Sequence, residues 1–139
     1  MKREHFSLTV APEPEESDRP TLHIAYDGPT ALLRERLHNP EDEALTDDEI
    51  DVAFRLQDDT RGVLSIADRH TGAFVFELEA DLDAIDRIVQ AAEADDERYR
   101  IVIETDGDAW TYDKETLLVY GVDGQLLRTD SLIPGSVEL

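Results

Sequence analysis

The chain has 139 residues, a formal net charge of −21 and no cysteine. It fits one domain with an ordinary core, and disulfides, thiolate zinc sites and cysteine nucleophiles are excluded. The longest run without a charged side chain, residues 5–12, is far shorter than the ~20 apolar residues that cross a bilayer. No apolar signal segment follows the first residues. We therefore expect a cytoplasmic protein without membrane contact.

The excess of acid is the strongest signal in the composition. There are 34 acidic and 13 basic residues, and only Lys2 and Lys114 are lysines. Such an excess repels itself in dilute buffer, whereas in 1 M salt the Debye length falls to about 3 Å and the repulsion is screened. The composition therefore predicts a halophilic protein and disfavours direct binding to nucleic acid. An acidic mimic of nucleic acid and an ordinary acidic protein remain as alternatives.

The first third of the chain predicts two strands and a helix. Phe6, Leu8 and Val10 alternate with polar residues, as do the apolar residues of 22–26, which is the period of a half-buried strand. Between them, residues 11–20 are rich in proline and charge and are predicted to form a solvated loop. Residues 30–37 predict a short helix behind Pro29. The acidic segment 38–49 is predicted to be a second solvated loop.

The middle of the chain predicts three strands and a longer helix. Residues 52–56, 62–68 and 73–79 alternate as strands, and we expect Phe74 to face inward together with Phe76. The short link 69–72 ends in Gly72, which favours a tight hairpin with positive φ. Asp81 or Asp83 then caps a helix whose apolar residues recur at helical spacing: Leu82, Ile85, Ile88, Val89 and Ala92.

The last third is predicted to be β. Residues 99–103, 110–112 and 117–120 read as strands, Asp123-Gly124 is the strongest hairpin signal, and residues 126–127 return as a final strand. The order is ββαβββαββββ. This predicts a single α+β domain over residues 1–139, with two helices and a largely antiparallel or mixed sheet of about eight or nine strands. A strand–helix–hairpin unit occurs twice, so an internal duplication is one interpretation.

No catalytic or metal motif stands out. Acidic residues adjoin each other as often as random placement gives, so clusters such as 47–51, 95–97 and 106–108 are interpreted as solvated surface. The glycine after Asp106 is misplaced for a calcium loop, and the chain lacks the HExxH, Walker and GxGxxG patterns. The four histidines lie apart; His5 and His23 could share an outward face without a third ligand. No cofactor or metal is predicted.

Two small constellations remain. Trp110 and Tyr112 are the one aromatic pair on a single strand face, and core packing is the preferred interpretation over a partner-binding surface. Arg98 and Arg100 stand out against the acid, and cross-strand salt bridges explain them more readily than anion binding.

The stretch from Asp68 to Val75, the Asp-rich helix after it and the ending from Leu132 to Leu139 together resemble a family of small haloarchaeal proteins known only as a domain of unknown function. The resemblance implies a haloarchaeal source and a cytoplasmic single domain. It implies no activity and no functional residues.

The sequence therefore leaves the function open. The preferred hypothesis is a non-enzymatic protein-interaction or regulatory module, with a protein partner or a second copy docking on an exposed edge strand. The alternatives are an enzyme that uses carboxylates or a divalent metal, and the acidic nucleic-acid mimic. The enzyme would need at least two carboxylates converging on a histidine.

Overall fold

Two four-stranded mixed sheets form the body of the domain. The computed structural model describes residues 6–11, 20–39, 41, 43–72, 74–93, 98–128 and 130–133, so most of the predicted loop 11–20 lies outside the described residues. The first sheet has the order β1-β2-β6-β7, with bounds β1 (Phe6–Ala11), β2 (Thr21–Tyr26), β6 (Tyr99–Thr105) and β7 (Asp108–Lys114). Its central pair, β2 and β6, is parallel, and the two outer pairs are antiparallel.

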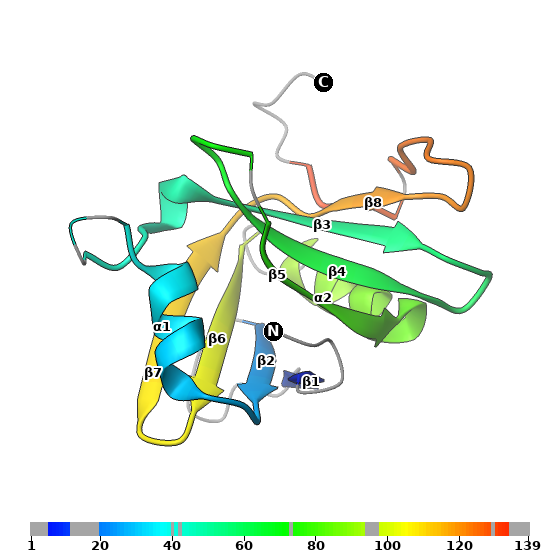
Figure 1. Cartoon of the computed structure of the whole chain (residues 1–139). Coiled ribbons are helices and arrows are strands. Elements are labelled where there is room, and N and C mark those ends of the chain that lie inside the picture. The colour runs from blue at the N-terminus through cyan, green and yellow to red at the C-terminus, as the bar shows by residue number, and fades with distance from the viewer. Residues whose placement is uncertain are drawn as a thin grey trace.

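The second sheet has the order β5-β4-β3-β8. Its strands are β3 (Ile50–Leu56), β4 (Arg61–Asp68), β5 (Phe74–Asp81) and β8 (Leu118–Tyr120). The first three form an antiparallel meander, and β8 joins β3 in parallel. Figure 1 shows that the chain passes directly from β7 in the first sheet to β8 in the second, and the segments from β2 to β3 and from β5 to β6 also cross between the sheets.

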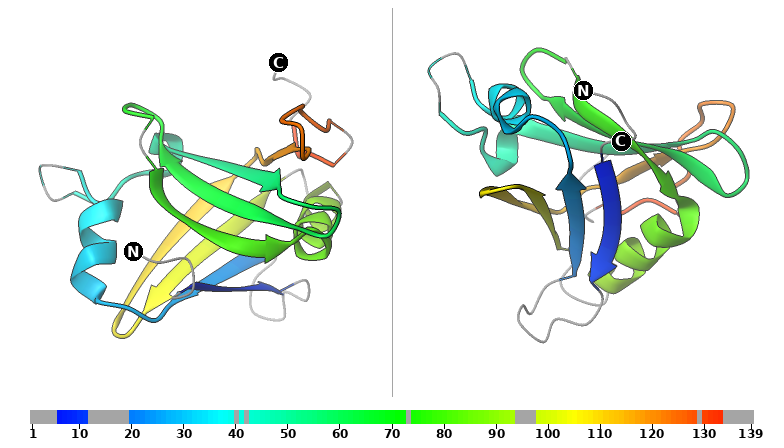
Figure 2. Two further views of the ribbon diagram at one scale, coloured as in Figure 1. Left: turned by 45° about the vertical axis from the view of Figure 1, so that its right-hand side comes forward. Right: turned by 60° about the horizontal axis from the view of Figure 1, so that its bottom comes forward.

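The two helices lie on opposite sides of the molecule (Figure 2). Helix α1 (Thr30–Leu37) buries Leu33 and Leu37, and α2 (Leu82–Glu93) packs against β1 and β5. The apolar residues of α2 recur every three to four positions, and those that are buried include Ile85, Ile88, Val89 and Ala92. Both predicted helices are thus confirmed. Neither described helix is long and apolar enough to span a bilayer.

The core fills the space between the inner faces of the sheets. Strand alternation sends every second side chain inward, and residues of both sheets and both helices form one apolar cluster. Phe6 of β1 stacks on Phe76 of β5, with ring centroids 4.7 Å apart. This contact brings the free edge strands of the two sheets together on the side away from the β7–β8 crossing.

The positive φ predicted at Gly72 is confirmed, and a turn forms at Asp123-Gly124. Gly72 and Gly124 have φ of 74° and 86°, a region that glycine enters without steric cost. The Gly124 amide donates to the Gly121 carbonyl at 2.9 Å. The strand predicted beyond this turn is shorter than expected: only the isolated bridges Tyr120↔Leu126 and Leu117↔Leu132 form there. The described strands therefore number eight.

The internal duplication finds no counterpart in the pairing. The strands β3, β4 and β5 stay in one sheet, whereas β6, β7 and β8 divide between two. Most described residues of the predicted loop 38–49 are exposed, and the segment also has local structure. Leu45 is buried, His38 bridges to Ala44, and Asp47–Glu49 forms a 3-10 helix, η2, whose start carries a capping box between Thr46 and Glu49.

Candidate functional site

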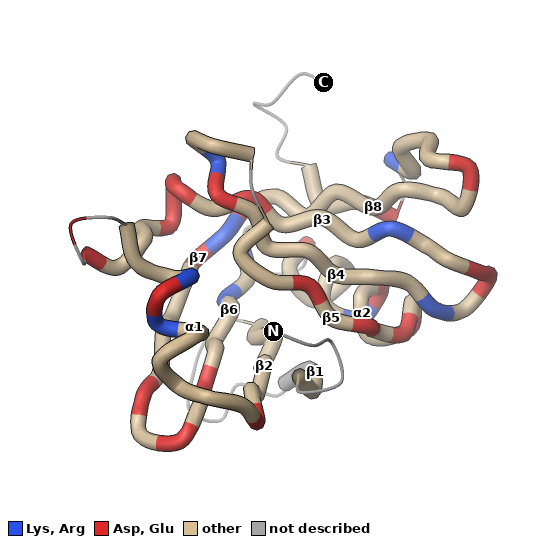
Figure 3. The backbone as a smooth tube through the Cα atoms, in the orientation of Figure 1, with Lys and Arg blue, Asp and Glu red and all other residues tan. Residues whose placement is uncertain are grey.

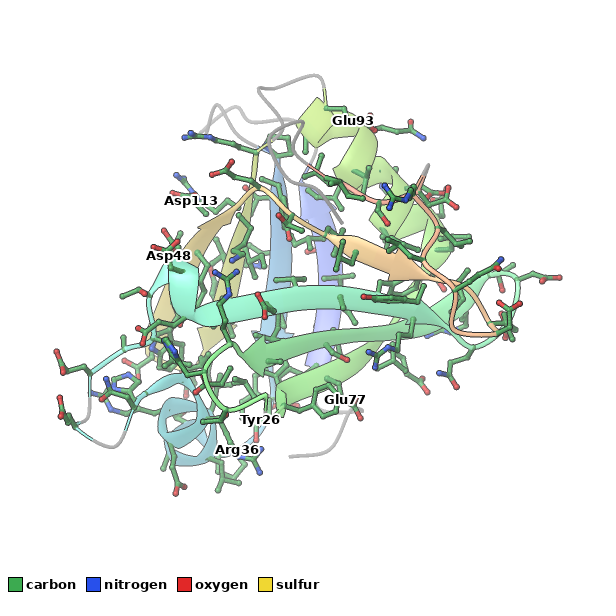
Figure 4. All side chains as sticks on the ribbon, turned by 90° about the horizontal axis from the view of Figure 1, so that it is seen from above. Tyr26, Arg36, Asp48, Glu77, Glu93 and Asp113 are labelled. Atoms are coloured by element: carbon green, nitrogen blue, oxygen red, sulfur yellow. The ribbon has the colours of Figure 1, made fainter. Side chains whose placement is uncertain are left out.

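The outer face of the second sheet carries a hollow. On β3, Val52 and Phe54 point into the core, so Asp51, Ala53 and Arg55 point outward. Figure 4 looks down on this face, and no described helix covers it. A groove of about 530 Å³ runs over it, lined by Asp51, Val52, Ala53, Arg55, Ser65, Ala67, Arg69, Gly72, Phe74, Lys114, Thr116, Leu118 and Tyr120.

Small side chains make the floor of this groove. Ala53 on β3 pairs with Ser65 on β4, and Ala67 lies one outward position further along β4. Ser65 is buried, and its hydroxyl reaches a Glu77 carboxylate oxygen at 3.5 Å. Because none of these side chains extends far from the sheet, the larger residues on either side stand above them as walls.

One wall is formed by Phe74, which is 51% exposed. The sequence predicted that this ring would face inward, and the prediction is wrong because a bulge interrupts the pairing of β4 with β5. Ile66 pairs with Phe76 but Ala67 pairs with Phe74, so Val75 is the extra residue. A bulge re-aims the side chains beyond it: Val75 and Phe76 are both buried, and Phe74 turns outward.

The opposite wall comes from Leu118 and Tyr120 on β8, both half-buried. Arg55 lies against this wall, with its guanidinium carbon 5.3 Å from the centre of the Tyr120 ring, within the range of a cation–π contact. Within the described part of the chain, Arg55 forms no ion pair. It is therefore a cation without a carboxylate on the surface of a strongly acidic protein.

The other cations of the groove are already engaged. Arg69 donates through both Nε and Nη2 to one Asp51 carboxylate oxygen, at 2.9 and 2.8 Å. Lys114 Nζ donates to the carbonyls of Asp47 and Ile50, at 2.7 and 2.8 Å. Burial lowers the pKa of Lys114, and nearby Arg69 acts in the same direction. Both cations hold the end of the groove at η2 in place.

The groove has the opposite charge balance to the chain. Its lining contains three cations, Arg55, Arg69 and Lys114, and one acid, Asp51, although the chain carries 34 acids and 13 basic residues. Figure 3 shows acidic residues on hairpins, helices and strand ends around the rest of the molecule. A local excess of cations on an acidic surface favours a negatively charged group in contact with it.

Trp110 and Tyr112 are buried, with 9% and 2% of their surface exposed, so neither ring offers a contact surface as it stands. Trp110 Nε1 donates to His38 Nε2 at 3.3 Å, and the two rings meet edge to face. Burial, together with the charges of Asp47 and Glu49, raises the pKa of Tyr112 to about 12. The preferred interpretation of this pair, core packing, agrees with its burial.

The acidic clusters and histidines do not converge. Among the residues that the structure places, no group of three potential ligands could hold a metal ion. His23 pairs with Glu104 at 2.9 Å, while His5 and the cluster 95–97 lie outside the described residues. Arg100 pairs with Asp113 across β6 and β7 at 2.9 Å, which confirms a cross-strand salt bridge for this arginine.

A second hollow, of about 420 Å³, lies between β1, β5 and α2. Its charged residues are paired: Arg61 contacts Asp81 at 3.0 Å, and Arg87 contacts Asp83 at 3.5 Å. It therefore combines balanced charges with little apolar surface, and it is a weaker candidate than the groove.

Sequence reasoning missed the groove for a physical reason. Ala53, Ser65 and Ala67 occupy outward strand positions where an acidic protein usually carries charge, and that run of small residues was a readable signal. Phe74 could not be assigned because the bulge that exposes it depends on pairing between two strands.

The comparisons with known proteins give a family and no activity. Neither a curated protein nor a solved structure matches the chain. The model of the family of unknown function DUF5793 matches residues 1–139. The chain therefore belongs to this family.

Proposed function

We propose that the domain is a non-enzymatic protein-binding module whose contact surface is the outer face of the second sheet. The observation that carries the proposal is the groove on this face, with its small-residue floor, its exposed Phe74 wall and its excess of cations. Apolar hollows rimmed by polar groups on a folded surface mark interaction sites. The remaining acidic surface keeps the protein soluble. The salt of a halophilic cytoplasm screens the repulsion between its carboxylates.

On the second sheet, the face is favoured over the edge strands as the route of contact. On the free edge of β5, Arg36 Nη1 reaches the carbonyls of Phe74 and Val75 at 3.4 Å. Along β8, the bridges to Leu126 and Leu132 occupy the edge. These neighbours compete with an incoming strand for the backbone groups that β-augmentation needs, whereas nothing described covers the groove.

The enzyme alternative finds less support in the same geometry. Acid–base chemistry on carboxylates would need at least two of them near a histidine. The described lining of the groove holds Asp51 as its acid, and the second hollow holds Glu79 and Asp81; neither lining includes a histidine. The nucleic-acid mimic would need a continuous acidic ridge, and basic residues interrupt the acids along the described backbone (Figure 3).

The proposal is tested by co-purification with matched variants, from a native lysate held at about 2 M KCl so that the acidic surface stays screened. Ala53→Gln fills the groove floor without changing the charge, and Ala25→Gln makes the same change on the exposed outer face of the first sheet. We expect a partner that is recovered with the parent and with Ala25→Gln and is lost with Ala53→Gln. Thermal unfolding of each variant shows that it is folded.

Recovery of the same partner with all three proteins, or of none with the parent, would contradict the proposal. In the first case the contact lies elsewhere on the molecule. In the second, the groove serves another purpose, and metals and metabolites would be screened by thermal shift in the same salt.

A further inference from the structure

We propose that the groove recognises an acidic segment of its protein partner, with Arg55 receiving a carboxylate and the space between Phe74 and Leu118 receiving an adjacent apolar side chain. This inference rests on the proposed function and assigns the chemistry of its ligand. It rests on the placement beside an apolar hollow of a guanidinium that pairs with no carboxylate among the described residues.

Arg55 is held in position without its donors being consumed. Its guanidinium carbon lies over the Tyr120 ring, 5.3 Å from the centroid, and among the described residues none accepts a hydrogen bond from its side-chain N–H groups. The planar fork of arginine matches a carboxylate through two parallel hydrogen bonds. Asp51, the acid in the described lining of the groove, lies two outward positions from Arg55 along β3, and its Oδ1 accepts from both Nε and Nη2 of Arg69, so it does not compete for Arg55.

The contrast with Arg61 and Arg100, the other two arginines of the sheet strands, supports this role. Arg61 pairs with Asp81 at 3.0 Å and Arg100 pairs with Asp113 at 2.9 Å, as expected where acids outnumber basic residues. Arg55 lies beside the apolar Leu118 and Ala53 instead, since Ala53 pairs with Leu118 and Arg55 with Tyr120 across β3 and β8. A carboxylate of the ligand would give Arg55 the ion pair that Asp81 gives Arg61 and Asp113 gives Arg100.

The apolar part of the ligand is set by the floor and walls. Ala53, Ser65 and Ala67 leave room above the sheet, and Phe74 and Leu118 border that room. With Phe74 51% exposed, the groove is open along the sheet, whereas small-molecule sites enclose most of their ligand. An open groove of this kind suits a chain segment that enters and leaves at the ends, and we therefore assign a polypeptide and not a free organic acid.

The net charge of −21 opposes the approach of an acidic segment at low salt. In molar KCl the long-range repulsion is screened within a few ångströms, and a partly buried contact at hydrogen-bond distance is screened much less. The recognition is therefore expected to operate in the salt at which the acidic surface is stable.

The experiment is an NMR titration of the ¹⁵N-labelled full chain in about 2 M KCl with two capped pentapeptides. One has a central leucine between two aspartates, and its twin has asparagines in their place. We expect the aspartate peptide to shift the amides of Ala53, Ala67 and Leu118 and to bind about fivefold more tightly than its twin, with a dissociation constant near 1 mM. Arg55→Gln should abolish this preference, and Arg34→Gln on the exposed face of α1 should preserve it.

Each other outcome overturns the inference. Equal binding of the twins in the groove would show that Arg55 does not receive a carboxylate, although the groove still binds a peptide and the proposed function stands. No groove shifts up to about 10 mM, together with a partner lost in Ala53→Gln, would leave the proposed function and remove the acidic ligand. The same titration is run with phenylacetate as a small organic acid. If phenylacetate bound more tightly than the aspartate peptide, the groove would be assigned to a small organic acid.

Discussion

The two sheets have similar size and opposite outer surfaces. On the first sheet, outward polar residues pair across strands, His23 with Glu104 and Arg100 with Asp113, each at 2.9 Å. On the second, the corresponding positions carry small residues beneath exposed Phe74 and unpaired Arg55. The first surface is what an acidic, solvated sheet face requires. The second departs from it, and that departure identifies the candidate contact surface.

Salt concentration is expected to have the largest effect on the stability of the domain. The chain carries a net charge of −21, and acids lie around both sheets (Figure 3). Lowering KCl from about 2 M to about 0.1 M should lower Tm by about 10 °C or more, because the repulsion is no longer screened. Circular dichroism melts across a KCl series measure this. A Tm that is insensitive to KCl would contradict the halophilic interpretation of the composition.

The next largest effect separates a buried cation from a surface one. Lys114→Met removes the donor that satisfies the Asp47 and Ile50 carbonyls, so it should lower the free energy of unfolding by about 2–3 kcal/mol. Arg100→Met on the outer face of the first sheet breaks a partly exposed pair and should cost less than about 1 kcal/mol. Urea unfolding in constant KCl compares them. Equal losses would show that Lys114 is no more than another surface cation.

Removal of the hydroxyl group should affect stability differently at two buried tyrosines. Tyr99 donates its hydroxyl hydrogen to the Thr116 carbonyl at 2.8 Å, so Tyr99→Phe should cost about 1 kcal/mol. The Tyr112 hydroxyl is buried, and no hydrogen-bond partner is found for it among the described residues. Tyr112→Phe should therefore be neutral or stabilise by about 1 kcal/mol. Losses of the same size in both variants would reveal a hidden partner for Tyr112.

The same pair has a pH signature. The pKa of Tyr112 is raised from 10.0 to about 12 by burial, so the folded form keeps a proton that the unfolded form loses. The stability linked to this group is present below pH 10 and is lost as pH rises toward about 12. The stability of Tyr112→Phe relative to the parent protein should therefore increase between pH 10 and about 12. A comparison of urea midpoints at rising pH would show this increase.

The smallest effect is expected at the turn between β3 and β4. Asp58 Oδ1 accepts hydrogen bonds from the amides of Thr60 and Arg61, at 2.8 and 2.9 Å, and these amides, Thr60 first, lower the pKa of Asp58. The stability linked to its ionised form is present above pH 3.8 and is lost as pH falls through the lowered pKa. Asp58→Ala should slightly destabilise the protein at pH 7 and differ less from the parent below that range. If the difference in stability between Asp58→Ala and the parent protein were unchanged at low pH, the ionised Asp58 carboxylate would not be what stabilises this turn.

Much of the fold was readable because the patterns that define it are local. The alternation of Leu22, Ile24 and Tyr26 and the helical spacing from Ile85 to Ala92 depend on neighbours in the sequence, and the structure confirms both elements. The division into two sheets depends on three connections that cross between them, from β2 to β3, from β5 to β6 and from β7 to β8, and no local pattern marks these crossings. The exposure of Phe74 depends on a bulge in the pairing of β4 with β5, and the position of Arg55 beside Tyr120 depends on a strand far along the chain.

The most direct test of the central claim places a photo-crosslinking amino acid at Phe74 in the groove and, separately, at Ala25 on the outer face of the first sheet. Both positions are exposed, so access to solvent does not distinguish them. After irradiation of cells or of a lysate in about 2 M KCl, we predict a discrete crosslinked protein from position 74 and none from position 25. The same crosslink from both positions, or from position 25 alone, would contradict the assignment of the second sheet as the contact surface.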